Sequence, residues 1–121
     1  MKKIKKNNSE ELKRIVVEAI LDKKGNEVLE LDLRNIEASV ADYFIVCHGN
    51  SGTQVNAIAD AVYKEVKDKL GLIPKGQEGK QNAQWIILDY FDVVVHVFFN
   101  ETREYYQLEE LWSDAIAVEH T

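Results

Sequence analysis

The most reactive side chains in this chain are one cysteine and the histidines near it. Cys47 and His48 are adjacent, which invites comparison with a thiol activated by an imidazole. Successive side chains of a strand point to opposite faces, so the two groups cannot pair if this segment is a strand. His96 is expected on an adjacent strand and can lie nearer to the thiol. Since a cysteine in an apolar strand usually packs as a small hydrophobic residue, we predict no catalytic cysteine.

Metal binding is poorly supported by the spacing of the candidate ligands. The three histidines show no ligand spacing with one another or with the cysteine. Asp89 and Asp92 are conceivable as a metal pair, but acidic residues beside a turn are common. His96 lies in a valine-rich strand, where we interpret it as a hydrogen-bonded structural histidine, with contact to a partner as the alternative. We therefore predict no metal site and no catalytic residues.

Residues 49–52, Gly-Asn-Ser-Gly, resemble a phosphate-binding loop in outline because they precede a predicted helix. The segment lacks both the Gly-x-x-x-x-Gly-Lys-Ser/Thr and the Gly-x-Gly-x-x-Gly patterns. Ser51 and Gln54 instead have the spacing of a helix capping box. Ordinary capping explains the segment, and we predict no cofactor.

The charge of the chain is unevenly distributed. The 121 residues include 15 Lys+Arg and 21 Asp+Glu, for a formal net charge of -6. Residues 85–121 contain eight acidic residues and one base, Arg103, whereas residues 1–84 are close to neutral. Such an acidic region is a poor surface for nucleic acid, whose phosphates are bound by Lys and Arg. It favours a basic partner, with a solvated acidic helix that maintains solubility as the alternative.

Aromatic residues are concentrated in the same acidic third. Exposed Trp and Tyr side chains are typical anchors of protein–protein interfaces. Part of the set must belong to the core, as we expect for Phe98 and Phe99. The remainder indicates docking onto a basic, partly apolar protein surface. Eight of the eleven aromatic residues belong to this set, namely Trp85, Tyr90, Phe91, Phe98, Phe99, Tyr105, Tyr106 and Trp112.

The elements that position these residues follow from the hydrophobic pattern. Apolar residues at helical spacing predict helices over 9–24 and 52–70 and a final helical region from Asn100. Residues 28–33 alternate, and residues 43–48 form a continuous apolar run, so we expect a half-buried strand and a fully covered strand. Residues 85–89 and 93–99 predict an antiparallel hairpin, and residues 75–84 an exposed loop with room for a short edge strand. The fold class is α/β, a mixed β-sheet with flanking helices.

The length of 121 residues is sufficient for one domain. We expect residues 1–8, with four lysines among the first six, to be a flexible basic tail, with contact to RNA or anionic lipid as the alternative. Residues 9–121 are then a single domain. We see no membrane span and no secretory signal. The lone Cys47 excludes an intrachain disulfide and fits a reducing cytoplasm.

Two segments of the last third carry a family resemblance. Residues 85–98, Trp-Ile-Ile-Leu-Asp-Tyr-Phe-Asp-Val-Val-Val-His-Val-Phe, and residues 103–112, Arg-Glu-Tyr-Tyr-Gln-Leu-Glu-Glu-Leu-Trp, closely resemble the ribosomal silencing factor family, also called Iojap-like. Residues 41–51, Gln54, Val55 and residues 76–79 fit the same family in the same order. The resemblance runs from about residue 9 to residue 113.

The resemblance implies a cytoplasmic protein that binds the large ribosomal subunit at ribosomal protein number fourteen, on the face that meets the small subunit. Such a protein blocks subunit joining sterically and lowers translation when nutrients are scarce. The resemblance also implies a nucleotidyltransferase-like topology without known catalysis, and association as a homodimer. We also expect no cofactor, and, from the short apolar runs and the acidic last third, no membrane and no specific nucleic acid as partner. A nucleotidyl-transfer enzyme and a dimeric adaptor for another basic partner are the alternatives.

Position in the motif and residue type suggest roles for individual residues. Asp89, Asp92 and Glu109 would steer the approach to a basic protein, and Arg103 would pair with a nearby carboxylate to order this surface. Apolar and aromatic groups would hold the complex. The full set of expected partner-binding residues is Trp85, Leu88, Asp89, Tyr90, Asp92, His96, Arg103, Tyr106, Glu109 and Trp112. Phe91 stands where the family often has Gly, so we expect a longer or bulged turn without a positive φ angle.

Overall fold

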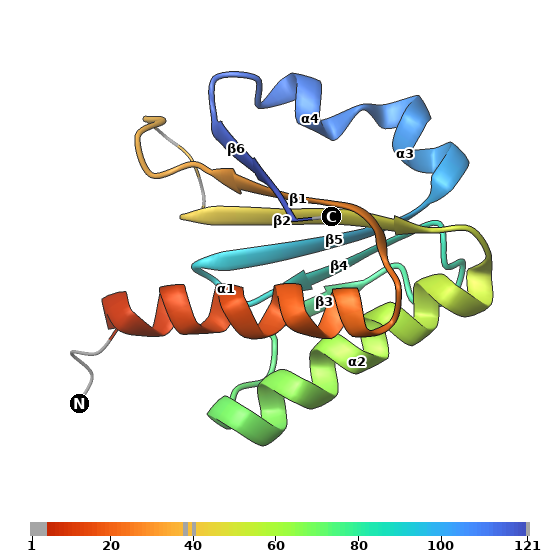
Figure 1. The fold of residues 1–121 in the computed structure, drawn as a ribbon, viewed down its shortest axis with the longest axis horizontal. Helices are drawn as coiled ribbons and strands as arrows, with labels where there is room; N and C mark the ends of the chain where they lie inside the picture. Colours follow the sequence, from red (N-terminus) through yellow and green to blue (C-terminus); the bar gives the residue numbers. More distant parts are fainter. Residues whose placement is uncertain (1–4, 38, 40, 121) are drawn as a thin grey trace.

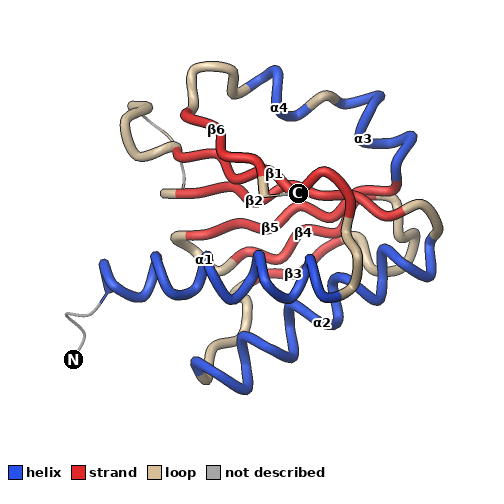
Figure 2. The backbone as a smooth tube through the Cα atoms, in the orientation of Figure 1, coloured by secondary structure: helices blue, strands red, loops and turns tan. Residues whose placement is uncertain are grey.

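A mixed β-sheet runs through the middle of the molecule, with helices on both faces (Figures 1 and 2). The computed structural model describes residues 5–37, 39 and 41–120. Its six strands lie in the order β3-β4-β5-β2-β1-β6, and only the central pair, β2 and β5, is parallel. The mixed α/β class is therefore confirmed. The elements are α1 (Lys5–Asp22), β1 (Asn26–Asp32), β2 (Tyr43–Gly49), α2 (Gly52–Leu70), β3 (Gly76–Glu78), β4 (Trp85–Asp89), β5 (Val93–Phe99), α3 (Asn100–Tyr106), α4 (Leu108–Leu111) and β6 (Ile116–Glu119).

The two faces of the sheet are covered by different parts of the chain. Figure 1 shows α1 and α2 on one face and α3 and α4 on the other. The apolar stripe of α2 is buried against the first face, as its spacing predicts. Each residue of β2 is buried, which is expected for a strand with helices on both sides. One core therefore lies beneath α1 and α2, and a second lies beneath α3 and α4.

Local capping fixes the ends of α2. The Ser51 hydroxyl accepts a hydrogen bond from the backbone N–H of Gln54 at 3.1 Å, and the Gln54 side chain accepts one from the N–H of Asn50 at 2.8 Å. Gly71 ends the helix with a φ of 69°, a conformation that glycine adopts without steric cost. The capping interpretation of residues 49–52 is thus confirmed. Gln54 also donates to the backbone oxygen of Lys24, which joins the end of α1 to the start of α2.

The first helix begins earlier than the sequence pattern indicates. We expected it to begin at residue 9, with Ser9 as its cap candidate, but α1 already includes Lys5, and the Ser9 hydroxyl donates to Asp42 at 3.4 Å. The apolar stripe does not reach these first residues, which are polar. A helix can extend past its buried face without an apolar partner. Of the predicted flexible tail, residues 1–4 lie outside the described residues.

The C-terminal segment also differs from the expectation of one final helix. Gln107 adopts a φ of 48° and divides the helical region into α3 and α4. The helical region does begin at Asn100, and Phe99 is the N-cap of α3. Residues 116–119 form β6, which pairs antiparallel with β1, so Glu119 lies in a strand and not in a solvated helix. Short exposed strands carry too weak an alternation to be recognised without their partner strand.

The turn between β4 and β5 is tighter than expected. Phe91 has a φ of 82°, which corrects the expectation that a residue other than glycine would avoid a positive φ. The N–H of Asp92 donates to the oxygen of Tyr90 at 3.0 Å, across a single residue as in a γ-turn. The Asp89 carboxylate accepts the N–H of Phe91 at 2.8 Å, which supports this conformation.

Candidate functional site

Trp85 lies at the centre of an aromatic cluster on the α3 side of the sheet. It begins β4, and register places it opposite Phe98 on β5. Its indole stacks on Phe98 at a centroid distance of 4.8 Å and contacts Tyr106 of α3 at 4.9 Å. Its Nε1–H donates to Nδ1 of His96 at 3.1 Å. The hairpin and α3 thus bring together three of the predicted site residues, Trp85, His96 and Tyr106.

The cluster continues to the surface on one side and across the sheet on the other. Tyr105 packs edge-on against Tyr106 at 5.1 Å, and the two rings are 81% and 49% exposed. On the same face of the sheet, the ring of Phe44 from the neighbouring strand β2 lies at centroid distances of 4.6 Å from His96 and 5.5 Å from Trp112. We call the accessible part of this cluster the aromatic face; it consists of Trp85, Tyr105, Tyr106 and Trp112.

His96 is buried beneath the aromatic face and is neutral there. Burial lowers the pKa of this histidine to about 4, because removal from water disfavours the charged imidazolium. The Trp85 indole only donates, so Nδ1 must accept and the proton of the neutral ring is on Nε2. This confirms the interpretation as a hydrogen-bonded structural histidine. Direct contact of His96 with a partner is wrong, because the residue is only 5% exposed.

Arg103 links the α3–α4 segment to the sheet. Its Nε and Nη2 donate to a carboxylate oxygen of Glu109, each at 2.9 Å. Its Nη1 lies 2.9 Å from both the backbone oxygen of Glu27 and Nδ1 of His48. The guanidinium is buried, so these contacts are little screened by water. The prediction that Arg103 pairs with a nearby carboxylate is confirmed, and that carboxylate is Glu109.

His48 is a member of this site that sequence reasoning missed. Since an arginine only donates, Nδ1 of His48 accepts from Arg103 and the imidazole is neutral. Burial, followed by the positive charge of Arg103, lowers the pKa of His48. The two residues are far apart in the sequence, and the pattern of residues gave no signal for their contact. Cys47, on the opposite face, is buried among apolar residues, and desolvation raises the pKa of its thiol to about 12.

Two of the predicted partner-binding residues are part of the core. Leu88 is fully buried beneath α1 and α2, and Tyr90 is 8% exposed in the same core. Side chains alternate along β4, so Leu88 points away from the face that carries Trp85. A direct role of Leu88 and Tyr90 in partner contact is therefore wrong. The sequence pattern could not assign the faces of β4, because apolar residues occupy both.

The predicted acidic residues do not form one cluster. Asp89 and Asp92 flank the turn at one end of the β4–β5 hairpin, whereas Trp85 lies at its other end. The backbone oxygen of Asp92 accepts from the N–H groups of Asp42 and Tyr43 and joins the turn to β2. Glu109, on α4, pairs with Arg103 of α3. Any steering by these groups is thus spread along the surface.

A recess beside Trp85 is open to solvent. It has a volume of about 500 Å³ and lies between the start of β4 and α3. Half of its lining residues are aromatic, and one acid, Glu101, comes from the first turn of α3. The Thr102 hydroxyl is hydrogen-bonded to the Gln84 side chain at 2.6 Å and closes one side. The lining residues are Gln84, Trp85, Glu101, Thr102, Tyr105 and Tyr106.

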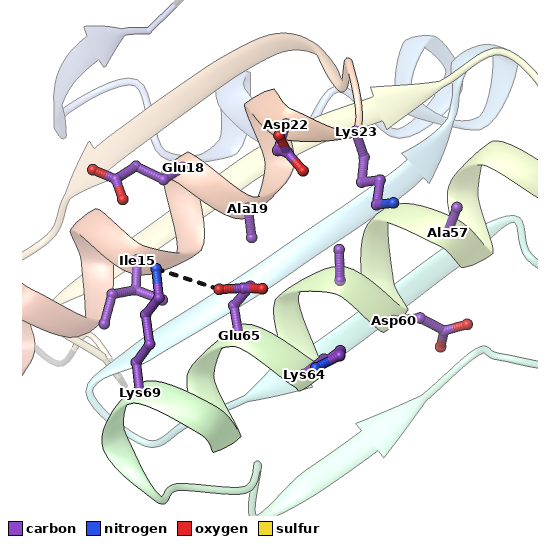
Figure 3. Close-up of a pocket in the computed structure, with 11 residues that line it drawn as sticks. Ile15, Glu18, Ala19, Asp22, Lys23, Ala57, Asp60, Lys64, Glu65 and Lys69 are labelled. Atoms are coloured by element: carbon purple, nitrogen blue, oxygen red, sulfur yellow. Dashed lines mark ion pairs between the residues drawn. The ribbon is translucent and has the colours of Figure 1, made fainter.

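A second groove lies on the opposite side of the molecule, between α1 and α2 (Figure 3). Its volume is about 670 Å³. Alanines form much of its floor, and acids and lysines alternate along its rims. These charges pair with near neighbours, as Lys69 does with Glu65 and Lys64 with Asp68. Such a solvated, self-paired surface offers no set of groups aimed at a ligand, so we place the functional site on the aromatic face.

Within the described ranges, no group of three or more His, Cys, Asp or Glu side chains is arranged to hold a metal ion. No helix in the same ranges has the length and apolar character needed to cross a membrane. The aromatic face presents large rings at the surface, and one of them, the Trp85 indole, is held by a part-buried hydrogen bond to His96.

Comparison with known proteins finds a matching family model and similar proteins. A family model described as "Ribosomal silencing factor during starvation" matches residues 6–121. The chain is 45% identical over 112 residues to the ribosomal silencing factor RsfS of Halalkalibacterium halodurans, covering 93% of this chain and 94% of the relative. It is also 45% identical over 108 residues to RsfS of Bacillus subtilis, covering 89% of this chain and 90% of the relative.

Solved structures show the same architecture. A crystal structure from Chromobacterium violaceum superposes with a TM-score of 0.80 at 36% identity, covering 86% of this chain and 85% of the other. A crystal structure from Bacillus halodurans gives a TM-score of 0.79 at 41% identity, covering 92% of this chain and 99% of the other. A mouse protein named for mitochondrial assembly of the ribosomal large subunit is 34% identical over 80 residues, 64% of this chain and 35% of that protein.

Proposed function

The chain belongs to the ribosomal silencing factor family, and from this premise we propose that it binds the large ribosomal subunit through ribosomal protein number fourteen. Bound there, it would occupy a site that the small subunit needs and would prevent the two subunits from joining. Translation would then fall when nutrients are scarce. The observation that carries this proposal is the family match over residues 6–121, which includes the whole aromatic face.

The aromatic face supports docking onto a protein. Tyr105 and Tyr106 are exposed, although such rings are usually buried when their only role is packing. Trp85 and Trp112 are half-buried, so each is anchored in the core and still presents one side to solvent. Residues of this kind dominate the energy of protein interfaces. Leu111, which is 75% exposed on α4, adds an apolar group close to Trp112.

The charge around this face suits a basic partner. Glu101 lines the recess beside Trp85, and Glu104, Glu109 and Glu110 line the neighbouring hollow above His48. Arg103 is buried in the wall of that hollow and is neutralised by Glu109. The surface therefore presents acidic side chains to solvent around an aromatic centre. Such complementarity accelerates encounter with a basic protein and aligns it before the apolar contacts form.

The mechanism is steric competition and requires no chemical step. A standard interface buries about 800 Å² on each partner, which a domain of this size can provide on one face. If that site is one where the small subunit must dock, occupancy alone prevents joining. We place this action in the cytoplasm, where bacterial subunits join. We also propose that the free protein forms a homodimer, which sedimentation equilibrium would detect as a mass twice that of the 13.9 kDa chain.

Co-sedimentation with purified ribosomal subunits tests the binding step. We expect the protein to pellet with large subunits at moderate salt and to remain in the supernatant with small subunits. Tyr106→Ala should weaken pelleting by about tenfold in affinity, because it removes an exposed anchor. Lys64→Ala, on the opposite face, is the matched control and should bind as the wild type does. Absence of pelleting with large subunits would refute the proposal.

A further inference from the structure

His96 is an unexpected residue for its position in the sheet. The other residues of β5 are valines and phenylalanines that fill the two cores. Nε2 of His96 is buried and has no hydrogen-bond partner within the described part of the chain. A buried, unpaired donor lowers stability, and an apolar residue of similar size would not carry that cost. Packing alone therefore does not explain a histidine here.

The interaction that His96 does supply is a hydrogen-bond acceptor for Trp85. Nδ1 of His96 lies 3.1 Å from the indole Nε1. Stacking on Phe98, with an interplanar angle of 27°, holds the plane of the indole. Stacking does not fix the rotation of a ring within its plane, whereas a directional hydrogen bond does. The two contacts together therefore restrain both the plane of the indole and its rotation within that plane.

We propose that His96 is a positioning residue for docking, whose Nδ1 holds the Trp85 indole in the orientation that the partner protein binds. The proposal rests on the proposed function, in which Trp85 anchors the aromatic face to the large ribosomal subunit. A side chain that is already fixed in its bound orientation loses less conformational freedom on binding. His96 thus acts on the partner through Trp85, without touching the partner itself.

A matched pair of variants separates this role from packing. Asn and Leu have nearly the same shape, but the Oδ1 of Asn can take the place of Nδ1 of histidine, whereas Leu has no acceptor. We would compare His96→Asn and His96→Leu by the indole N–H signal of Trp85 in ¹H–¹⁵N spectra. This signal is assigned by its loss in Trp85→Phe. Thermal unfolding and affinity for purified large subunits complete the comparison.

We expect His96→Asn to keep the Trp85 indole N–H shifted and slow to exchange, and to bind within about threefold of the wild type. His96→Leu should be at least as thermally stable as His96→Asn but should bind about tenfold more weakly, with a rapidly exchanging indole N–H. A packing role would instead make affinity follow stability. Equal affinities of the two variants, or an unchanged indole signal in His96→Leu, would overturn the proposal.

A measurement on the wild-type protein gives an independent test that no unfolded variant can obscure. Long-range ¹H–¹⁵N spectra should show His96 with a bare Nδ1 and a protonated Nε2 at neutral pH. A protonated Nδ1 would overturn the proposal, because that nitrogen could not accept from the indole. If the wild type fails to bind large subunits, the proposed function is wrong, while the spectra still decide whether His96 holds Trp85.

Discussion

Phe91 occupies a backbone conformation that a residue with a Cβ atom rarely adopts. Its φ of 82° is held by the Asp89 carboxylate and by the turn hydrogen bond to Asp92. The ring is 65% exposed, so it gains little from burial, and the Lys75 ammonium lies 4.9 Å from the ring centroid. The fold therefore tolerates this residue at a cost in conformational energy.

Replacing Phe91 should separate the backbone cost from the effect of the ring. We expect Phe91→Gly to be more stable than Phe91→Ala by about 1 kcal/mol, because only glycine adopts a positive φ freely. Both variants lose the ring and its contact with Lys75, so that effect cancels in the comparison. Urea unfolding measures the difference. If Phe91→Ala proved as stable as Phe91→Gly, the turn would not be strained.

The neutral His96 predicts how stability depends on pH. Its pKa is about 4 in the folded protein and 6.5 in an ordinary environment. Between these values the unfolded chain binds a proton that the folded protein does not. The free energy of unfolding should therefore fall by roughly 3 kcal/mol as the pH is lowered from 6.5 to 4. Well above pH 6.5 His96 is neutral in both states, so the protein keeps the full stability that is lost on acidification.

Urea unfolding at a series of pH values checks this dependence. His96→Asn removes the titrating group, so its stability should decline less steeply over the same window. His48, whose pKa is also lowered, remains in both proteins and contributes the same slope to each. Parallel pH profiles for wild type and variant would show that His96 is not buried in its neutral form.

At the scale of elements, Arg103 links the α3–α4 segment to the sheet. It joins α4 through Glu109, β1 through the oxygen of Glu27, and β2 through His48. We expect Arg103→Ala to lower the free energy of unfolding by about 3 kcal/mol, since it removes charged hydrogen bonds from a buried site. Hydrogen exchange in residues 100–112 should accelerate more than in β2 or β5.

Glu109→Gln is the matched control for Arg103→Ala. Gln keeps an acceptor for the guanidinium but lacks the negative charge of Glu109. We therefore expect the free energy of unfolding to fall by about 1 kcal/mol, with a smaller change in hydrogen exchange. Unchanged exchange of residues 100–112 in Arg103→Ala would mean that packing of Leu108 and Trp112 alone fixes the segment.

The elements with strong periodicity could be predicted from the sequence. The buried stripe of α2, the continuous run of β2 and the β4–β5 hairpin all follow from local pattern and turn chemistry. Two features could not be predicted, because they depend on contacts distant in sequence. These are β6, which is a strand only because β1 offers it an edge, and the contact of Arg103 with His48. The break at Gln107 was also missed, because it places a positive φ at a residue other than glycine.

For the candidate site, the sequence predicted many of the residues that belong to it, but not how they are arranged. Trp85, Tyr106 and Trp112 do reach the surface, and Arg103 does pair with a carboxylate. Leu88 was misassigned because an apolar residue on β4 can face either side of a sheet that is covered on both. Only the register of β4 with β5 decides which side each residue faces.

At the scale of the whole molecule, acidic and aromatic groups should affect different steps of binding. Removing two charges with the double variant Asp89→Asn and Glu101→Gln should slow association about threefold at low salt, with the difference vanishing at high salt. The control double variant Glu11→Gln and Glu18→Gln, on α1, changes the net charge equally and should associate as the wild type does. Stopped-flow mixing with large subunits measures both rates. Equal slowing by the two double variants would indicate net charge alone.

Trp85→Ala should act on dissociation instead. Loss of an anchor shortens the lifetime of a complex with little effect on its formation. We expect dissociation from large subunits to accelerate at least tenfold, with an association rate within about twofold of the wild type. Circular dichroism must show a folded variant. An unfolded Trp85→Ala would mean that the residue serves the core, as Leu88 does, and is no anchor.

The measurement that tests the central claim most directly is light scattering of mixed ribosomal subunits. Large and small subunits are combined at a magnesium concentration that supports joining, with increasing amounts of the protein. We predict that scattering from joined ribosomes falls to the level of separate subunits as the protein saturates the large subunit, and that Tyr106→Ala needs a higher concentration to do so. Full joining in the presence of a saturating excess of wild-type protein would contradict the account.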